Sequence, residues 1–231
     1  MFALLVTALM SSPIPPGSTQ LVLVITPSAD STSGVLFRFQ RSRATRDWTR
    51  VGESWPVVVG ERGLAAGLGL HRGILPRLPV KVEGDGRSPG GVFDLVEAFG
   101  FDRPAPGLRM PYRQLTETVE CVDDPESVDY ARITDRRSSS DWHSSERMRE
   151  IPGYVWGIVV GHNPNRKKGA GSCIFLHAWS SPSGKTAGCT AMESSRIHEL
   201  VNWLDERAAP VLVQLTEDLH QDLKLAWQLP E

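Results

Sequence analysis

The chain has 231 residues, of which 40% are hydrophobic and 23% are charged, and its formal net charge is -2 at pH 7. A chain of this length can bury a substantial core in one larger domain or in two small ones. So small a net charge gives no electrostatic reason to expect nucleic acid or an anionic membrane as a partner, and we expect neither.

The first twenty residues differ in composition from the rest. Phe2 to Met10 form an apolar run about as long as the core of a signal peptide, and small residues and prolines follow through Pro16. The run lacks a basic start and a clear cleavage site, so we interpret residues 1–20 as a degraded export signal or a flexible N-terminal segment, with an ordinary first strand as the alternative. No other apolar stretch approaches the roughly 20 residues that span a bilayer. We expect residues 21–231 to form a single domain with no transmembrane segment.

The first sixty residues favour β-structure. Apolar or alternating runs at Leu21–Thr26 and Val35–Gln40 predict strands, and the Ser, Thr and Gly residues between them predict a hairpin loop. The same pattern continues in Trp48–Val51 and Pro56–Val59. We therefore expect this part of the chain to form a β-meander.

Strand patterns persist through the middle of the chain, and helical periodicity appears only near its end. One helix is predicted after Glu193, because the apolar residues from Ile197 to Leu204 fall on one face. A second, less regular helix is predicted at Asp218–Trp227. Further strands are predicted at Leu78–Val82, Val92–Val96, Thr116–Val122, Tyr154–Val160, Cys173–Leu176 and Val211–Leu215. The sequence therefore predicts a mostly β fold with one or two helices packed on it.

Three cysteines cannot all pair within one chain, so at least one of Cys121, Cys173 and Cys189 is free or pairs elsewhere. Cys173 lies in an apolar run, which suits a small buried residue, and Cys121 can be read in the same way. A disulfide between these two would leave Cys189 as the free thiol. The sequence alone does not establish the geometry that such a bond needs.

The stretch from Ser172 to Met192 contains a thiol and an imidazole that can lie close together in the fold. Cys189 follows His177 by twelve positions, a separation that suits two strand or loop ends joined by an excursion. A free thiol is only a few per cent ionised near neutral pH, so a cysteine nucleophile needs a base such as His177. Gly188 permits a tight turn, and the N–H groups of Gly188 and Cys189 could form an oxyanion hole. These residues predict nucleophilic catalysis by Cys189.

Two other kinds of site fit the sequence less well. A structural zinc site normally uses four ligands in spacings such as C-x-x-C or H-x-x-x-H, whereas this chain offers only the scattered residues Cys173, Cys189, His177 and His162. The glycine-rich stretch from Gly84 to Gly91 lacks the Gly-Lys-Ser/Thr that opens a phosphate-binding helix. We expect neither a metal nor an organic cofactor.

Two segments of the chain resemble the L,D-transpeptidase catalytic domain of the YkuD type. The segment Lys81–Phe93, reading KVEGDGRSPGGVF, is similar to that family's Lys…Gly-Asp…Thr-Pro-x-Gly-x-Phe pattern. His177, a loop and then Thr186-Ala187-Gly188-Cys189 resemble its His…Ser/Thr-x-Gly-Cys signature. The resemblance covers roughly Leu78 to Met192. It implies a β-sandwich or barrel-like fold and an exported protein of the periplasm or cell envelope.

The activity that the resemblance implies is acyl transfer on peptidoglycan stem peptides. Cys189 would attack the carbonyl between the diamino acid and the terminal D-alanine, releasing D-alanine and leaving a thioester, with His177 as base and then acid. An amine acceptor gives a cross-link, and water gives L,D-carboxypeptidase activity. A non-catalytic peptidoglycan-binding module of the same fold is a further alternative. The sequence leaves the acceptor and the oligomeric state open.

The positions expected to hold the substrate depart from the family's usual pattern. Ala187 stands where many members carry histidine, and Ala191 stands where many carry arginine or asparagine. Three nearby cations are candidate substitutes for the missing polar groups, namely Arg87, Lys185 and Arg196. The residues predicted to contact or shape the substrate groove are Thr186, Ala187, Trp179, Arg87 and His162.

Overall fold

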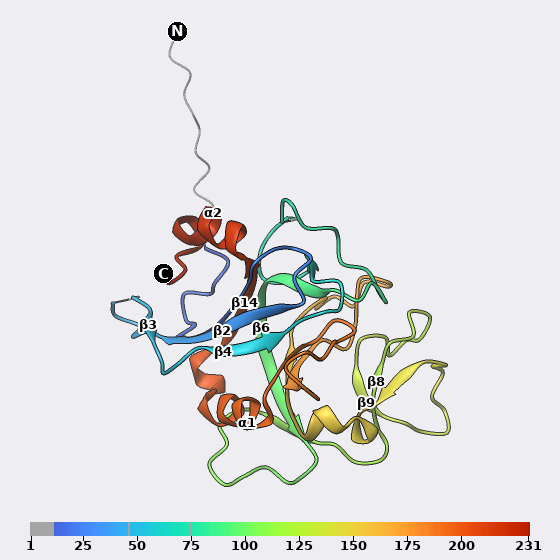
Figure 1. Cartoon of the computed structure of the whole chain (residues 1–231). Helices are drawn as coiled ribbons and strands as arrows, with labels where there is room; N and C mark the ends of the chain where they lie inside the picture. Colours follow the sequence, from blue (N-terminus) through green and yellow to red (C-terminus); the bar gives the residue numbers. More distant parts are fainter. Residues whose placement is uncertain (1–11, 46, 74) are drawn as a thin grey trace.

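Eight strands close into a mixed β-barrel in the computed structural model, which describes residues 12–45, 47–73 and 75–231 (Figure 1). Their order around the barrel is β1-β14-β6-β11-β12-β13-β4-β2, and β2 pairs with β1 to close the ring. The β1–β14 and β12–β13 pairs are parallel, and the other pairs are antiparallel. In chain order the barrel strands are β1 (Gln20–Thr26), β2 (Ser33–Gln40), β4 (Trp55–Val58), β6 (Ser88–Gly100), β11 (Trp156–Val160), β12 (Phe175–Ala178), β13 (Thr190–Met192) and β14 (Val211–Thr216). The predicted mostly β, barrel-like fold is confirmed.

Shorter elements surround the barrel. A separate small sheet has the order β10-β8-β9 and lies beside the barrel in Figure 1. The remaining strands, 3-10 helices and α-helices are β3 (Thr49–Arg50), β5 (Leu64–Ala66), β7 (Tyr112–Gln114), β8 (Val119–Val122), β9 (Ile133–Asp135), β10 (Ser145–Arg147), η1 (Met148–Glu150), η2 (Pro152–Val155), η3 (Glu206–Ala208), α1 (Ser194–Trp203) and α2 (Glu217–Trp227).

The two α-helices cover the outside of the barrel with their apolar faces. Ile197, Leu200 and Val201 of α1 are fully buried, as the sequence periodicity predicts. Each such side chain removed from water contributes about 1.5–3 kcal/mol to folding. Leu219 and Trp227 anchor α2 in the same way, and the Thr216 hydroxyl caps this helix by accepting the N–H of Leu219. Neither α1 nor α2, nor any other helix in the described ranges, is long and apolar enough to cross a bilayer.

A second apolar cluster fills the space between the barrel and the small sheet. Phe99 of β6 and Phe175 of β12 meet edge to face with their ring centroids 5.1 Å apart, and Tyr154 of η2 packs against both rings. Aromatic pairs of this geometry add about 0.5–1.5 kcal/mol beyond the burial of their area. Met148 and Cys189 belong to the same cluster. The cluster therefore joins the small sheet to the loop that carries the free thiol.

A buried carboxylate holds the small sheet together. Glu120 of β8 accepts hydrogen bonds from Arg136, Trp142 and Ser145. Burial by itself would raise the pKa of Glu120, but the hydrogen bonds from these three partners outweigh it and lower the pKa to about 2. Because β8 also carries Cys121, this network fixes the strand from which the disulfide described below begins.

Several element boundaries differ from the sequence prediction, each for a local reason. The expected strand Leu78–Val82 is reduced to an isolated bridge between Val80 and Ala66, because the Asp85 carboxylate accepts the Val82 N–H and turns the chain away. β12 begins at Phe175, since Cys173 has a φ of 53° that does not fit a strand.

The expected strand Tyr154–Val160 begins two residues late, because Tyr154 belongs to η2, which starts at Pro152. The predicted strand Thr116–Val122 is shortened to β8. The first sixty residues depart from a simple meander in that β3 and β4 both pair with β2. The predicted export signal Phe2–Met10 lies outside the described residues.

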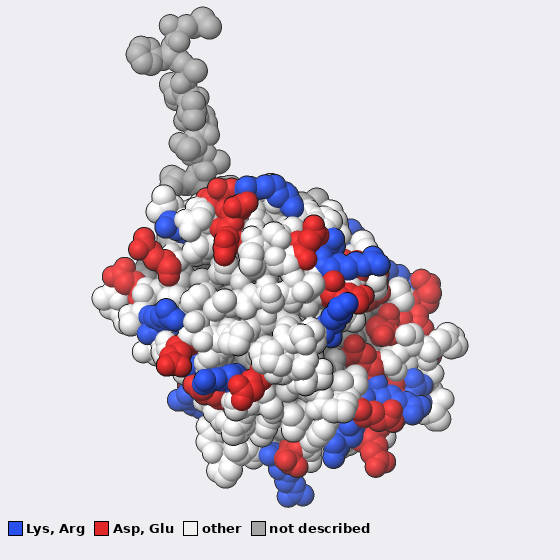
Figure 2. Space-filling model, viewed as in Figure 1, with Lys and Arg blue, Asp and Glu red and all other residues white. Residues whose placement is uncertain are grey.

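Charged side chains are mixed over the face of the molecule in Figure 2. Acidic and basic groups alternate there, and the central area carries neither. This distribution agrees with the small net charge of the chain.

Candidate functional site

Cys189 lies in the loop that leads into β13, and its main chain is held by one side chain from the same loop and by another from β6. The hydroxyl of Thr186 donates a hydrogen bond to the Cys189 carbonyl oxygen at 2.6 Å, and the hydroxyl of Ser88 donates a second at 2.8 Å. A Cβ atom at Gly188 would lie only 3.1 Å from the carbonyl oxygen of Arg87, so glycine suits this close approach. The segments Lys81–Phe93 and Thr186–Cys189 therefore meet at the main chain of Gly188 and Cys189.

The thiol of Cys189 is buried among main-chain groups, and the residue is only 7% exposed. Its S–H donates to the Cys173 carbonyl oxygen at 3.4 Å, and its sulfur accepts the N–H of Phe175 at 3.3 Å. Burial raises the pKa of the Cys189 thiol well above its ordinary value, and the charge of Glu146 raises it further, while the Phe175 N–H opposes the increase. At neutral pH the resting thiol is therefore protonated and needs a base before it can act as a nucleophile.

His177 is the base that the sequence predicts. It lies on β12, and its Nδ1 is 2.8 Å from the Ala178 carbonyl oxygen, which can only accept a hydrogen bond. Nδ1 therefore carries the proton, and Nε2 keeps a free lone pair. Burial lowers the pKa of His177, whereas the bond to Ala178 opposes the decrease. A neutral imidazole of this tautomer can accept a proton at Nε2.

A glycine makes room for the imidazole. A Cβ atom at Gly153 in η2 would lie 2.6 Å from the Ala178 carbonyl oxygen and 3.1 Å from Nδ1 of His177. The first distance is shorter than atoms tolerate, so any larger residue at this position would displace η2 or the ring. Gly153 was not among the residues that the sequence singled out, and a lone glycine after proline carries no catalytic signal.

Tyr154 touches both members of the predicted pair. Its ring packs edge to face on the imidazole of His177 with the centroids 5.1 Å apart, and its hydroxyl lies near enough to the Cys189 side chain to act on the pKa of the thiol. The same hydroxyl donates to the Glu146 carboxylate at 2.6 Å. Sequence reasoning missed Tyr154 and Glu146. The aromatic run that begins at Tyr154 indicated a strand, and nothing in the sequence around Glu146 distinguished it from a surface acid.

A cavity of about 400 Å³ opens beside His177. Trp179, Lys185 and Thr186 line it. Cys189 does not line this cavity. The cavity therefore presents the imidazole, while the sulfur stays covered by the loop around Cys173.

The three candidate cations occupy different surroundings. The Arg87 guanidinium pairs with Asp30 at 2.9 Å and donates to the Leu64 carbonyl, so its side chain is engaged away from the cavity. Arg196 pairs with Glu199 at 3.1 Å and also stacks over Trp55. Lys185, in contrast, forms no ion pair or hydrogen bond with any of the residues that the structure describes. Of the three, Lys185 is the one that borders the cavity.

The other two predicted binding residues are placed apart from the cavity lining. His162 is buried, with Nδ1 accepting the Leu68 N–H and Nε2 bonded to the Ala170 carbonyl. Burial lowers the pKa of His162 to about 4, so this ring is neutral. Ala187 is exposed on the loop before the thiol. The structure thus brings Thr186, Trp179 and His177 together at one cavity and leaves His162 elsewhere.

The other two cysteines form a disulfide. Cys121 of β8 is bonded to Cys173, which leaves Cys189 as the free cysteine. Cys173 therefore has no thiolate to offer a metal. Among the described residues, no three His, Cys, Asp or Glu side chains are grouped so that they could hold a metal ion.

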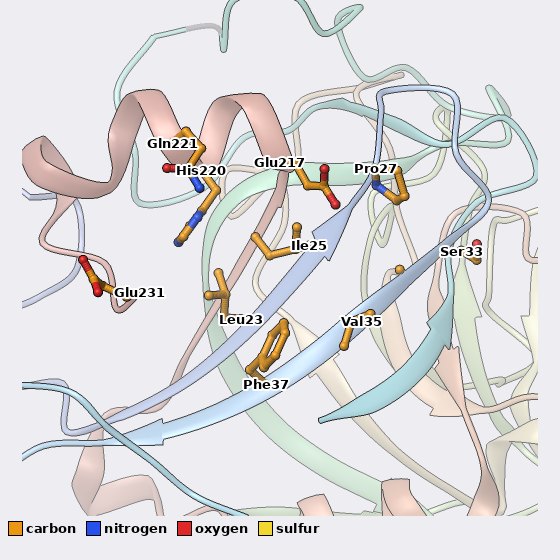
Figure 3. A pocket seen from close by; sticks show the side chains of 11 residues that line it. Leu23, Ile25, Pro27, Ser33, Val35, Phe37, Glu217, His220, Gln221 and Glu231 are labelled. Carbon is orange, nitrogen blue, oxygen red and sulfur yellow. The ribbon is translucent and has the colours of Figure 1, made fainter. Parts of the chain in front are cut away.

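A further cavity lies on another part of the barrel. It measures about 450 Å³ and separates α2 from the outer face of the β1–β2 hairpin (Figure 3). Leu23, Ile25 and Phe37 supply an apolar floor, and His220 faces them from α2. The ring of His220 is bonded to the Pro230 carbonyl. Neither His177 nor Thr186 lines this cavity, so it is separate from the cavity beside His177.

Comparison with known proteins gives one family and one distant structural likeness. The family model described as the L,D-transpeptidase catalytic domain (YkuD) matches residues 38–213. One similar solved structure is the helical cell shape determining protein Pgp2 from Campylobacter jejuni, with a TM-score of 0.39 and 11% sequence identity. The alignment covers 85% of this chain and 47% of that chain, so the present chain spans less than half of that protein. No curated protein matches the chain.

Proposed function

Because the chain belongs to the L,D-transpeptidase catalytic domain (YkuD) family, we propose that it is a cysteine acyltransferase acting on peptidoglycan stem peptides. Cys189 is the nucleophile and His177 is the base in this proposal. The observation that carries it is the arrangement around the free thiol, where Thr186 and Ser88 both hold the Cys189 carbonyl beside the cavity of His177. We also propose that residues 21–231 act as one catalytic unit.

The reaction begins with loss of the thiol proton. The neutral Nε2 of His177 accepts the proton of Cys189, and the thiolate attacks the carbonyl carbon between the diamino acid and the terminal D-alanine. The N–H groups of Gly188 and Cys189 donate to the oxyanion that forms, a role in which one donor contributes about 3–4 kcal/mol in known enzymes. The protonated imidazole then returns its proton to the departing amine. D-alanine leaves, and a thioester remains on Cys189.

The acyl group of the thioester is then transferred to an acceptor, and the Cys189 thiol is released. An amine of a second stem peptide gives an L,D-cross-link, and water gives a shortened stem peptide. Trp179 and Lys185 border the cavity in which the stem peptide would lie, and we assign them to substrate binding. The family and the disulfide both agree with an extracytoplasmic protein, and we propose the periplasm or cell envelope as its location.

Incubation with a disaccharide tetrapeptide tests the function. Mass spectrometry should detect free D-alanine together with a cross-linked dimer, and Cys189→Ala should release none. A shortened monomer without a dimer would assign the enzyme to hydrolysis. If the wild type releases no D-alanine, or if Cys189→Ala releases as much, the proposal is wrong and a non-catalytic peptidoglycan-binding module is favoured.

A further inference from the structure

Three side chains form a chain of polar contacts that ends at the reacting sulfur. The carboxylate of Glu146 accepts the hydrogen bond of the Tyr154 hydroxyl at 2.6 Å, and Tyr154 packs in one cluster with Cys189, where its hydroxyl acts on the pKa of the thiol. Tyr154 is buried and Glu146 is partly buried. Because Tyr154 lies within an apolar cluster, its contact with Glu146 is stronger than it would be in water.

The fold fixes this chain of contacts from three directions. Glu146 lies on β10 directly opposite Cys121 of β8, whose sulfur is bonded to Cys173. The Tyr154 ring is wedged between Phe99 and Phe175, with its centroid 5.6 Å and 5.4 Å from theirs. So many contacts leave the phenol ring little freedom to reorient. The hydroxyl is therefore held in place beside the sulfur.

We propose that Tyr154 is a further catalytic residue of this site and that Glu146 is its positioning residue. The Tyr154 hydroxyl donates a hydrogen bond to the Cys189 thiolate, and Glu146 decides whether that proton is available. The inference rests on the proposed function in one respect, which is that Cys189 is the nucleophile. Neither residue belongs to the Thr186–Cys189 signature or to the Lys81–Phe93 segment.

The protons can be followed through the two states of Glu146. When Glu146 is ionised, the Tyr154 O–H donates to the carboxylate, and the tyrosine has no proton left to donate to the sulfur. When Glu146 is protonated, its own O–H donates to the Tyr154 oxygen, and the Tyr154 O–H turns to the sulfur. The S–H proton goes to Nε2 of His177 in either case. The Phe175 N–H donates to the sulfur in both states, and only in the second state does Tyr154 add a further hydrogen bond to the thiolate. No bond between heavy atoms is made or broken.

Glu146 changes its charge in the neutral range. Burial raises the pKa of Glu146 to about 7, the bond from Tyr154 opposes the increase, and the charges of Asp123 and Glu83 reinforce it. The other charged group that acts on the thiol is Lys81, whose ammonium lowers the pKa of Cys189. Because burial lowers the pKa of His177, the imidazole stays neutral while Glu146 titrates.

The pH dependence follows from these charges. Below the pKa of the thiol, the thiolate fraction rises tenfold for each pH unit. As Glu146 ionises near pH 7, it raises the pKa of the thiol, so the logarithm of the alkylation rate of Cys189 should rise with a slope below one. A neutral residue at 146 removes this effect. The slope should then stay at one from pH 6 to pH 9.

Alkylation of the full-length protein by iodoacetamide tests the assignment without any peptidoglycan. The rate at Cys189 is measured by mass spectrometry from pH 6 to pH 9. At pH 6, where Glu146 is mostly protonated, Tyr154→Phe should slow alkylation about tenfold, because a hydrogen bond to a charged group is lost. Glu146→Gln should speed it about tenfold at pH 8 and restore the slope of one. Tyr112→Phe and Glu150→Gln serve as matched controls, since Tyr112 donates to the Asp102 carbonyl and Glu150 pairs with Arg147.

Release of D-alanine by the same variants separates this inference from the proposed function. A Tyr154→Phe protein that keeps its disulfide but shows the wild-type rate and slope would overturn the inference. If Tyr154→Phe does not fold, Glu146→Gln carries the test, and an unchanged rate at pH 8 overturns it. If the variants show the expected alkylation rates but the wild type releases no D-alanine, the Tyr154 assignment stands and only the proposed function is removed.

Discussion

The thiol of Cys189 donates its hydrogen bond to the carbonyl of Cys173, whose own side chain is bonded to Cys121. One residue, Cys173, therefore links the disulfide to the candidate nucleophile: its side chain forms the disulfide, and its carbonyl contacts the thiol. Cys173 also has a φ of 53°, a conformation that an ordinary residue adopts at a cost. The disulfide helps to hold Cys173 in this conformation and so to keep its carbonyl against the thiol.

Removal of the disulfide should weaken both the fold and the site. The bond joins residues 52 positions apart, and native disulfides typically contribute about 2–4 kcal/mol to stability. We expect the variant carrying Cys121→Ala and Cys173→Ala to unfold at lower urea concentration and to release D-alanine more slowly. Denaturation and D-alanine release are measured with and without reductant on the wild type. A reduced wild type with unchanged stability and unchanged turnover would contradict this expectation.

Gly153→Ala should disturb the base without touching the thiol. The added Cβ would lie 2.6 Å from the Ala178 carbonyl, which is the acceptor of Nδ1 of His177. We expect D-alanine release to fall about tenfold to a hundredfold, since small displacements of a catalytic group have effects of this size. Gly17→Ala is the control, because a Cβ there meets nothing within 4 Å. Equal activity of both variants would show that η2 yields without moving the ring.

Lys185 is expected to bind a carboxylate of the stem peptide. It borders the cavity of His177, whereas Arg87 and Arg196 are paired with other groups. Lys185→Ala should raise KM about fivefold, equivalent to about 1 kcal/mol, with little change in kcat. Lys185→Arg should restore most of the affinity. Lys168→Ala is the matched control, since Lys168 is an exposed lysine paired with Glu126. An equal KM for both alanine variants would exclude the role.

The barrel could be predicted from the sequence because strands and amphipathic helices leave a local pattern. β1, β2 and β14 lie where the apolar runs placed them, and α1 buries the face that its periodicity indicated. Two parts of the candidate site were also local in sequence. His177 and Cys189 share a short stretch, and Trp179 and Thr186 from that stretch line one cavity with His177.

The rest of the site depends on contacts between distant segments. Glu146 and Tyr154 are 8 positions apart, but they meet only because the chain turns through η1 and η2, and no pattern in the sequence records those turns. The Cys121–Cys173 bond was one open possibility among three cysteines until the fold placed their Cα atoms 5.9 Å apart. Leu78–Val82 looked like a strand, yet the Asp85 side chain turned it aside.

Glu146→Gln should make the protein more stable at alkaline pH. The pKa of Glu146 rises from 4.5 to about 7 on folding, so the folded state holds this proton more tightly than the unfolded state does. Stability therefore falls as pH rises from 4.5 towards 7, and above 7 the loss stays constant, at most on the order of 3 kcal/mol. Glutamine keeps a partner for Tyr154 and carries no charge. The free energy of unfolding of the variant, measured by urea denaturation, should therefore exceed that of the wild type by about 1–3 kcal/mol at pH 8 and match it at pH 4.5.

Glu150→Gln removes an exposed carboxylate from the neighbouring segment and should show no such pH-dependent gain. A gain from Glu146→Gln that is equal at both pH values would mean that its carboxyl group titrates normally, and the coupling to Tyr154 would then lose its electrostatic basis.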